Sequence, residues 1–188
     1  MIIIVNKKRF ALSAACIAVA VLLAVSLAAR PVKKLIYPLK YEDIIYKYSE
    51  KYSLDPYLVM GVISAESRFD PNAVSHRDAK GLMQIKDDTA RWCAEKFNTD
   101  VSAENLFDPE TNIAIGCAYI NYLLQIFGGE AETALAAYNG GQGNVSSWLG
   151  DGRYSSDGKR LYKIPFGETE RYVEKVLARQ QIYWKLYR

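Results

Sequence analysis

Glu66 is the side chain whose place in the sequence suggests chemistry. Residues 56–69 predict a helix whose apolar stripe includes Val62 and Phe69, and Glu66 lies on this stripe near the carboxyl end of the helix. Burial disfavours a charged carboxyl group, and so does the negative end of the helix dipole. Both effects raise the pKa, and a carboxyl group that is protonated near neutral pH can act as a general acid. The structural alternative is a glutamate that turns back to solvent or pairs with Arg68.

Helical patterns dominate the rest of the chain and must position this glutamate. Proline follows aspartate at Asp55-Pro56 and again at Asp108-Pro109, a pair that is typical of a helix start. The second pair begins the clearest helix, which we expect to end at Gly128-Gly129. Strand patterns are scarce, so we predict a compact, mainly α-helical fold. Further helices are expected near 44–52, 87–97, 130–138 and from 168 onward, with a glycine-rich loop after 138 and a loop or small hairpin at 150–166.

Charge and cysteine content argue against several classes of function. Seven of the 24 basic residues lie in residues 1–40, which hold no acidic residue, so residues 41–188 carry 17 basic and 21 acidic side chains. This mildly acidic part lacks the basic surface of a nucleic-acid-binding protein, so we expect no nucleic-acid partner. One histidine and three cysteines, not spaced as ligands, argue against a metal site. Cys93 and Cys117 lie on apolar helix faces and are expected to be buried free thiols, with a disulfide as the alternative.

Residues 10–29 form an apolar segment of twenty residues without a charge. At about 1.5 Å per residue, a helix of that length spans the roughly 30 Å hydrocarbon layer once. We therefore predict a single transmembrane helix at 10–29, preceded by residues 1–9 and followed by a linker at 30–40 and a domain at 41–188. A cleaved signal peptide is the alternative, although its apolar core usually has only about 7–15 residues. Basic residues flank both ends, so charge alone does not fix the orientation.

Four blocks of residues give the chain a family resemblance. The first is Glu66-Ser67 with Phe69, Pro71, Ala73 and Ser75, and the second is Gly81-Leu82-Met83-Gln84-Ile85 with Thr89-Ala90. The third is Ala136-Ala137-Tyr138-Asn139-Gly140 with Gly143 and Val145, and the fourth is Pro165 and Phe166 with Glu168-Thr169, Tyr172-Val173 and Val176. In this order the blocks resemble the soluble-type lytic transglycosylases, glycoside hydrolase family 23, which also includes the goose-type lysozymes. The best match is the small membrane-anchored type with a lysozyme-like domain.

This resemblance implies an enzyme that cleaves the β-1,4 bond between N-acetylmuramic acid and N-acetylglucosamine in peptidoglycan. Glu66 would protonate the bridging oxygen and would then accept the proton of the muramic acid 6-hydroxyl, which attacks internally and leaves a 1,6-anhydromuramic end. Ordinary glycosidases use two carboxylates, so this would be a single-glutamate variant, and no metal or cofactor is implied. The resemblance also suggests substrate-side roles for Ser67, Gly81, Met83, Gln84, Tyr138, Asn139 and Tyr172.

Most of these side chains have a structural alternative. Ser67 would position the catalytic glutamate or simply end its helix, and Met83 would pack against a sugar face or fill the core. Tyr138 and Asn139 would point into a cleft or cap a helix. Tyr172 would tune the pKa of the glutamate or be an ordinary core aromatic. For Gln84 the resemblance implies a hydrogen bond to a sugar or to its N-acetyl group.

Two other functions stay open at this stage. A goose-type lysozyme would hydrolyse the same bond with water, and Asp70 or Asp78 is near enough in sequence to be its second carboxylate. A non-catalytic peptidoglycan-binding accessory would keep the cleft without turnover. Glu168 is expected to stabilise the first turn of its helix. Asp78 stands where the family usually has glycine, which puts the conformation of its loop in question.

The implied substrate also bears on topology and partners. Peptidoglycan lies outside the cytoplasmic membrane, so we expect the domain on the extracytoplasmic side, with Lys7, Lys8 and Arg9 in the cytoplasm. An extended linker at 30–40 would reach about 3 Å per residue and keep the domain near the membrane. The expected partners are glycan strands and the membrane, and other cell-wall or envelope proteins are left open.

Overall fold

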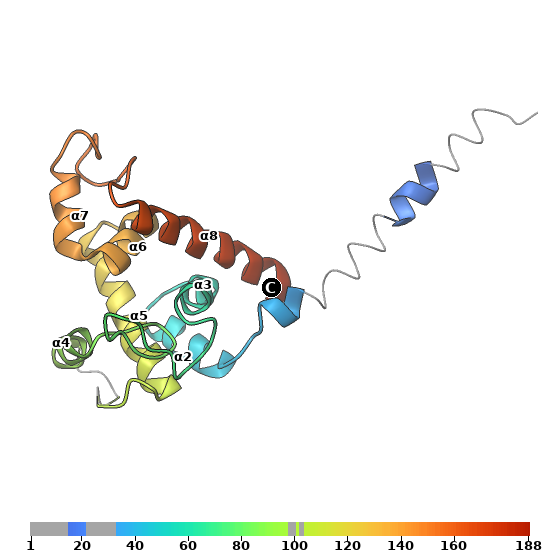
Figure 1. The fold of residues 1–188 in the computed structure, drawn as a ribbon, viewed down its shortest axis with the longest axis horizontal. Helices are drawn as coiled ribbons and strands as arrows, with labels where there is room; N and C mark the ends of the chain where they lie inside the picture. Colours follow the sequence, from blue (N-terminus) through green and yellow to red (C-terminus); the bar gives the residue numbers. More distant parts are fainter. Residues whose placement is uncertain (1–14, 22–32, 98–100, 102–103) are drawn as a thin grey trace, which may run out of the picture. The chain divides into compact units, whose positions relative to one another are not determined.

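A computed structural model describes residues 15–21, 33–97, 101 and 104–188 (Figure 1). The chain divides into two compact units between Leu39 and Lys40. The second unit, Lys40–Arg188, is built from helices, which in chain order are α2 (Glu42–Lys51), α3 (Pro56–Glu66), α4 (Asp87–Phe97), α5 (Pro109–Ile126), α6 (Ala131–Gly140), α7 (Gln142–Leu149) and α8 (Gly167–Tyr187). In the described residues, β-structure is limited to isolated bridges at 74, 80 and 85, so the prediction of a mainly α-helical fold is confirmed.

The predicted membrane segment at 10–29 lies mostly outside the described residues. Residues 15–21 of that segment are described and are helical, and a second short helical stretch occupies 33–36. Within the described residues, no helix has the length and apolar character that a bilayer crossing needs.

Local capping signals placed the starts of the two central helices correctly. The Asp55 carboxylate accepts the backbone N–H of Tyr57 at 2.9 Å, and the Asp108 carboxylate accepts that of Thr111 at 2.8 Å. Both aspartates precede a proline in the first helical turn, where its missing N–H costs nothing. Cys93 and Cys117 are buried free thiols, as predicted.

Two predicted features of the fold were wrong. Helix α3 ends at Glu66 rather than near Phe69, because Arg68 and Phe69 both adopt left-handed backbone angles (φ 56° and 64°) that reverse the chain. The stretch after Tyr138 is not a loop but continues into α7, in which Val145 and Trp148 are buried. Packing of these two side chains outweighs the unfavourable helix propensity of the surrounding glycines.

Helix α8 crosses α3 in close contact and forms one side of the core (Figure 1). A Cβ atom on Gly61 of α3 would lie 2.9 Å from the carbonyl oxygen of Val176 and 3.1 Å from the backbone nitrogen of Gln180. Only glycine allows this approach of the two backbones. At the amino end of α3, the Gln180 side-chain amide donates to the carboxylate of the capping residue Asp55 at 2.6 Å.

Asn112, fully buried in α5, fixes the long connection between α3 and α4. Its amide nitrogen donates to the carbonyl oxygens of Lys80 (2.9 Å) and Leu106 (2.8 Å), and its amide oxygen accepts the N–H of Met83 at 2.7 Å. Gly81 lies against the same amide, since a Cβ there would be 2.3 Å from its nitrogen. A single side chain therefore satisfies three backbone groups of two loops, which would otherwise be buried without partners.

Replacing Asn112 should destabilise the fold strongly. Asn112→Ala leaves three backbone groups without a partner, and each unsatisfied buried group costs about 1–3 kcal/mol. We expect the free energy of unfolding to fall by about 3 kcal/mol or more in chemical denaturation of the chain in a non-ionic detergent. Asn72→Ala, at an exposed position, is the control. Equal losses in the two variants would contradict this account of Asn112.

Candidate active site

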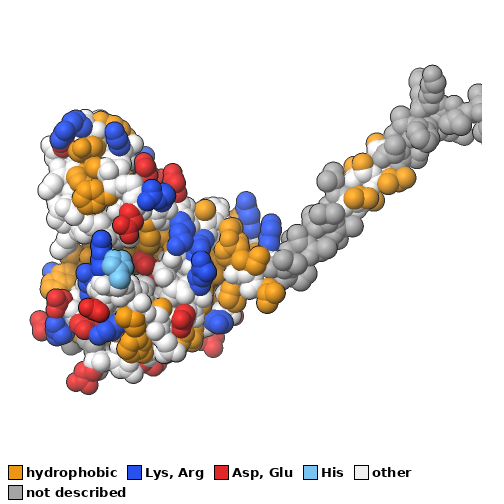
Figure 2. Space-filling view, in the orientation of Figure 1, with side chains coloured by type: hydrophobic (Ala, Val, Ile, Leu, Met, Phe, Trp, Pro, Cys, Tyr) orange, Lys and Arg blue, Asp and Glu red, His pale blue; other side chains and the backbone are white. Residues whose placement is uncertain are grey.

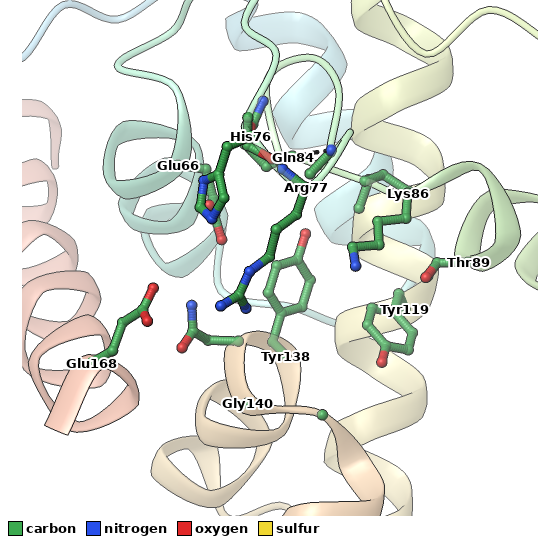
Figure 3. A pocket seen from close by; sticks show the side chains of 15 residues that line it. Glu66, His76, Arg77, Gln84, Lys86, Thr89, Tyr119, Tyr138, Gly140 and Glu168 are labelled. Atoms are coloured by element: carbon green, nitrogen blue, oxygen red, sulfur yellow. Dashed lines mark hydrogen bonds between the residues drawn. The ribbon is translucent and has the colours of Figure 1, made fainter. Parts of the chain in front are cut away.

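A cleft of about 450 Å³ opens beside the end of α3. One of its side chains is the only histidine of the chain, His76, which is pale blue in Figure 2. The lining comes from the end of α3, the connection to α4, the middle of α5, the end of α6 and the start of α8 (Figure 3). The lining residues are Glu66, Ser75, His76, Arg77, Ala79, Gln84, Ile85, Lys86, Thr89, Tyr119, Tyr138, Asn139, Gly140, Gly141 and Glu168.

Glu66, the last residue of α3, is partly buried and faces this cleft. Burial raises the pKa of its carboxyl group from an ordinary value of 4.5 to about 7, although Tyr172 and the positive charge of Lys175 both act to lower it. The Tyr172 hydroxyl is buried near this carboxyl group, but it meets hydrogen-bond geometry with no described atom. Near neutral pH, Glu66 can therefore be protonated and still lose its proton at little cost.

Two cations of α8 bind the carboxyl end of α3, where Glu66 sits. Lys175 Nζ donates to the carbonyl oxygen of Ala65 at 2.7 Å. Arg179 donates to the carbonyl oxygen of Ser64 and to its hydroxyl, the latter at 2.9 Å. These carbonyls belong to the last turn of a helix and have no partner within it. The cations thus satisfy the helix end and offset its negative dipole beside the glutamate.

Tyr138 and Asn139 reach the cleft from the end of α6, and both are held by hydrogen bonds. The Tyr138 hydroxyl donates to the carbonyl oxygen of Met83 at 2.7 Å, and the Thr169 hydroxyl donates to the Asn139 amide oxygen at 2.9 Å. The Asn139 oxygen is thus occupied, and its amide N–H groups, which bind no described residue, are left to donate to a ligand.

Gln84 has a left-handed backbone (φ 51°) and fixes the cleft wall from within. Its amide nitrogen donates to the carbonyl oxygens of Gly81 (2.9 Å) and Ala73 (3.1 Å). The amide oxygen is the remaining acceptor that a sugar hydroxyl or N–H group could use. Asp78 also adopts a left-handed backbone (φ 58°), so it holds the conformation for which glycine is usual, as aspartate can more readily than most residues.

The structure brings four of the eight predicted site residues to the cleft, namely Glu66, Gln84, Tyr138 and Asn139. Met83 is not among them: its side chain has no exposed surface and packs against Gly116, so it fills the core rather than facing a sugar. Gly81 is buried against Asn112 and does not line the cleft. The structure explains the glycine by the lack of room for a side chain at this position. The hydroxyl of Ser67 donates to the carbonyl oxygen of Ile63 (3.3 Å) and so caps α3.

Sequence reasoning missed several residues of the site. Lys175 and Arg179 gave no signal, because only the crossing of α8 over α3 brings them to the end of α3. Arg77, Lys86 and Tyr119 line the cleft without having been singled out. Thr169, which holds Asn139, is part of the fourth sequence block, so the block itself was the available signal.

The carboxylates considered as a second catalytic group lie elsewhere. Asp70 accepts the N–H of Asn72 at 2.9 Å in a local turn, and neither Asp70 nor Asp78 lines the cleft. The second carboxylate at the cleft is Glu168, at the start of α8. In the part of the chain that the structure describes, no group of three or more histidine, cysteine, aspartate or glutamate side chains could hold a metal ion.

A comparison with protein families decides the relationship. Residues 43–160 match the family model described as the transglycosylase SLT domain. The chain belongs to this family. All four predicted cleft residues lie within the matched range.

Individual relatives in the SLT family agree with the match. The chain is 37 % identical over 150 residues to the soluble lytic murein transglycosylase of Escherichia coli, which covers 78 % of this chain and 23 % of that protein. It is 34 % identical over 166 residues to the membrane-bound lytic murein transglycosylase C of Pectobacterium atrosepticum, covering 77 % and 46 % of the two chains. The chain therefore spans less than half the length of these relatives.

Solved structures of the SLT family share the fold. The 70 kDa soluble lytic transglycosylase of Escherichia coli superposes with a TM-score of 0.72 and 34 % identity over 81 % of this chain and 25 % of its own. An inactive Glu-to-Gln mutant of lytic transglycosylase Slt from Pseudomonas aeruginosa gives the same TM-score, with 30 % identity and the same coverage of the two chains. The lysozyme-like helical fold is thereby established.

The raised pKa of Glu66 should make stability depend on pH. Between about pH 4.5 and 7 the unfolded chain has released the Glu66 proton while the folded chain retains it, so stability falls as the pH rises through this window. Each pKa unit corresponds to about 1.4 kcal/mol, so the wild type should lose on the order of 3 kcal/mol relative to Glu66→Gln. Denaturant unfolding from pH 4 to 8 measures this difference.

The control for this pH series is Glu174→Gln, an exposed carboxyl on the same helix as Lys175. If the free energy of unfolding of Glu66→Gln fell with pH as steeply as that of the wild type, Glu66 would not be the group that causes the pH dependence.

Proposed function

We propose that this SLT-family chain is a peptidoglycan lytic transglycosylase. It cleaves the β-1,4 bond between N-acetylmuramic acid and N-acetylglucosamine and leaves a 1,6-anhydromuramic end. The observation that carries the proposal is Glu66, a partly buried carboxyl group in a cleft with a pKa of about 7. A group of that pKa has both a proton to donate and a carboxylate to accept one at neutral pH, and a single-glutamate reaction needs both.

In the proposed reaction Glu66 acts twice. It first donates its proton to the bridging oxygen as the bond from that oxygen to the anomeric carbon breaks, so that N-acetylglucosamine leaves as an alcohol. The N-acetyl oxygen of the muramic acid stabilises the positive anomeric carbon. The 6-hydroxyl of the same sugar then bonds to that carbon, and Glu66 takes its proton. The glutamate returns to its initial state, and no water is consumed.

An internal nucleophile makes substrate positioning decisive, because the 6-hydroxyl attacks only from a suitable ring conformation. Asn139 and Gln84 support this part of the proposal, because both are fixed by hydrogen bonds at the cleft and still have a group left for the sugar, the amide N–H groups of Asn139 and the amide oxygen of Gln84. We assign Tyr172 and Lys175 to tuning the carboxyl group of Glu66, and Tyr138, which lines the cleft, to shaping its wall.

Hydrolysis of the same bond is the competing outcome, and Glu168 is the observation that favours it. It is a second carboxylate at the cleft, and two carboxylates are what an ordinary glycosidase uses. In the transglycosylase reaction, Glu168 stays at the first turn of α8, where a negative charge is stabilising.

The products distinguish these reactions. Digestion of purified peptidoglycan by the full chain in a non-ionic detergent should release muropeptides with anhydro ends, one water lighter than reducing ends. Glu66→Gln should lower the rate about a thousandfold, as loss of a general acid–base group typically does. Mass spectrometry of the ends measures both results.

Glu168→Gln and Glu174→Gln accompany that digestion as controls. Reducing ends that disappear in Glu168→Gln would establish a lysozyme instead. Binding of peptidoglycan without release of any fragment would establish the non-catalytic accessory.

We also propose that residues 10–29 anchor the chain in the cytoplasmic membrane, with residues 1–9 inside, a linker at 30–40, and the domain at 41–188 outside. The uncharged run of twenty residues supports this topology, and so does the extracytoplasmic location of peptidoglycan. Several of its relatives are named membrane-bound lytic murein transglycosylase C.

Protease accessibility tests the topology. In spheroplasts that produce the full chain, an external protease should degrade the domain without lysis, while a cytoplasmic marker protein stays intact. The chain should remain in the membrane fraction at high salt, because apolar anchoring is not screened by ions. Protection of the domain until lysis would place it in the cytoplasm and overturn the proposal.

A further inference from the structure

One wall of the cleft carries positive charge that the reaction at Glu66 does not use. This wall is the segment 75–89, and the charged side chains that it contributes to the cleft are Arg77 and Lys86, with His76 beside them and no acidic residue. The cleft's acidic side chains, Glu66 and Glu168, come from α3 and α8 instead (Figure 3). The cleft is therefore polarised, with the basic groups on the 75–89 wall.

Two basic side chains of this wall, Arg77 and Lys86, have no partner among the described residues, whereas the charges that follow Lys86 in sequence are paired. Arg77 and Lys86 are exposed, and neither side chain makes an ion pair or hydrogen bond with a described residue. By contrast, Asp87 binds Lys80 at 2.7 Å, and Asp88 binds Arg91. Asp78 adjoins Arg77 in sequence but does not line the cleft. Two cations at the cleft are thus left for a ligand.

The backbone that carries Arg77 is held in place, so its side chain projects from a defined point. The Ser75 hydroxyl accepts the N–H groups of Arg77 (3.2 Å) and Ala79 (3.1 Å), and the N–H of Asp78 donates to the Ser75 carbonyl oxygen at 3.1 Å. In Figure 3 the Arg77 guanidinium extends across the cleft beside Tyr138, and the amino group of Lys86 lies on the same side of the cleft as Thr89.

We propose that Arg77 and Lys86 form a subsite that binds the carboxylate carried by the lactyl arm of muramic acid, either directly or through the attached peptide stem. This inference rests on the proposed function. The sugar rings of the glycan are uncharged. Negative charge enters as the carboxylates of the peptide stem or, once the stem is removed, as the lactyl carboxylate itself. Arginine suits either source, because its guanidinium binds a carboxylate with two parallel hydrogen bonds. Glu168 on the opposite side repels the same group and so favours one orientation of the strand.

The subsite predicts a loss that depends on the substrate's charge. The full chain in a non-ionic detergent is assayed on three glycan preparations: strands with free stem carboxylates, strands stripped of stems by an amidase, and strands whose carboxylates have been converted to methylamides. On strands with free carboxylates, Arg77→Gln and Lys86→Gln should each raise KM three- to tenfold. On the methylamide strands this loss should shrink to less than twofold, because the partner charge is gone.

Matched variants separate the subsite from a general effect. Lys163→Gln removes the same charge at an exposed position that does not line the cleft, and it should leave the kinetics unchanged. Arg77→Lys should lose less affinity than Arg77→Gln, because lysine keeps the positive charge but cannot form the two parallel hydrogen bonds of a guanidinium. A loss confined to stem-bearing strands assigns the stem carboxylates, and a loss confined to stripped strands assigns the lactyl carboxylate.

Two results would overturn the subsite. One is an equal rise of KM on charged and methylamide strands, and the other is no change in either variant. Direct binding of the three strand preparations to the Glu66→Gln chain, with and without Arg77→Gln, gives the same comparison without turnover. If the wild type releases no product from any strand, the proposed reaction fails, and the binding comparison alone decides the subsite.

Discussion

The contact between the carboxyl end of α3 and the cations of α8 is the interaction on which the site depends. A helix that ends inside a protein leaves carbonyl groups that need donors, and here Lys175 and Arg179 supply them. The same end carries Glu66, so the groups that complete the helix also set the potential at its carboxyl group. Burial raises the pKa, and Tyr172 together with the positive charge of Lys175 limits the rise to about 7. The contact made by Lys175 therefore both completes the helix end and contributes to the acid strength of Glu66.

The opposite wall of the cleft depends on a continuous set of hydrogen bonds. Asn112 of α5 accepts the N–H of Met83, and the carbonyl oxygen of Met83 accepts the hydroxyl of Tyr138 from α6. Through these bonds the backbone at Met83 joins three separate parts of the fold. Met83 thus contributes to the cleft wall through its backbone N–H and carbonyl groups. Its side chain fills the space left open by Gly116.

How far the sequence predicts this protein depends on the range of the interactions involved. Glu66 could be found, because an acidic residue on an apolar stripe conflicts with its own helix, and Asp55 and Asp108 mark helix starts through bonds two or three residues away. Lys175 could not be found, because its partner lies 110 positions earlier in the chain. Helix α7 was missed for a related reason: Gly143 and the glycines on either side of α7 argue locally against a helix, while Trp148 stabilises it through an edge-on contact with Phe166.

Gly61 has a mechanical consequence. With the backbones of α3 and α8 in contact at this glycine, the two helices cannot slide past each other without a steric clash. Glu66, the last residue of α3, therefore lies on a helix whose position relative to α8 is fixed. The exposed side chains of Arg77 and Lys86, on the connection between α3 and α4, are not restrained in this way. The proposed acid and the proposed carboxylate-binding side chains thus lie on separate parts of the chain, one rigidly packed and the other exposed.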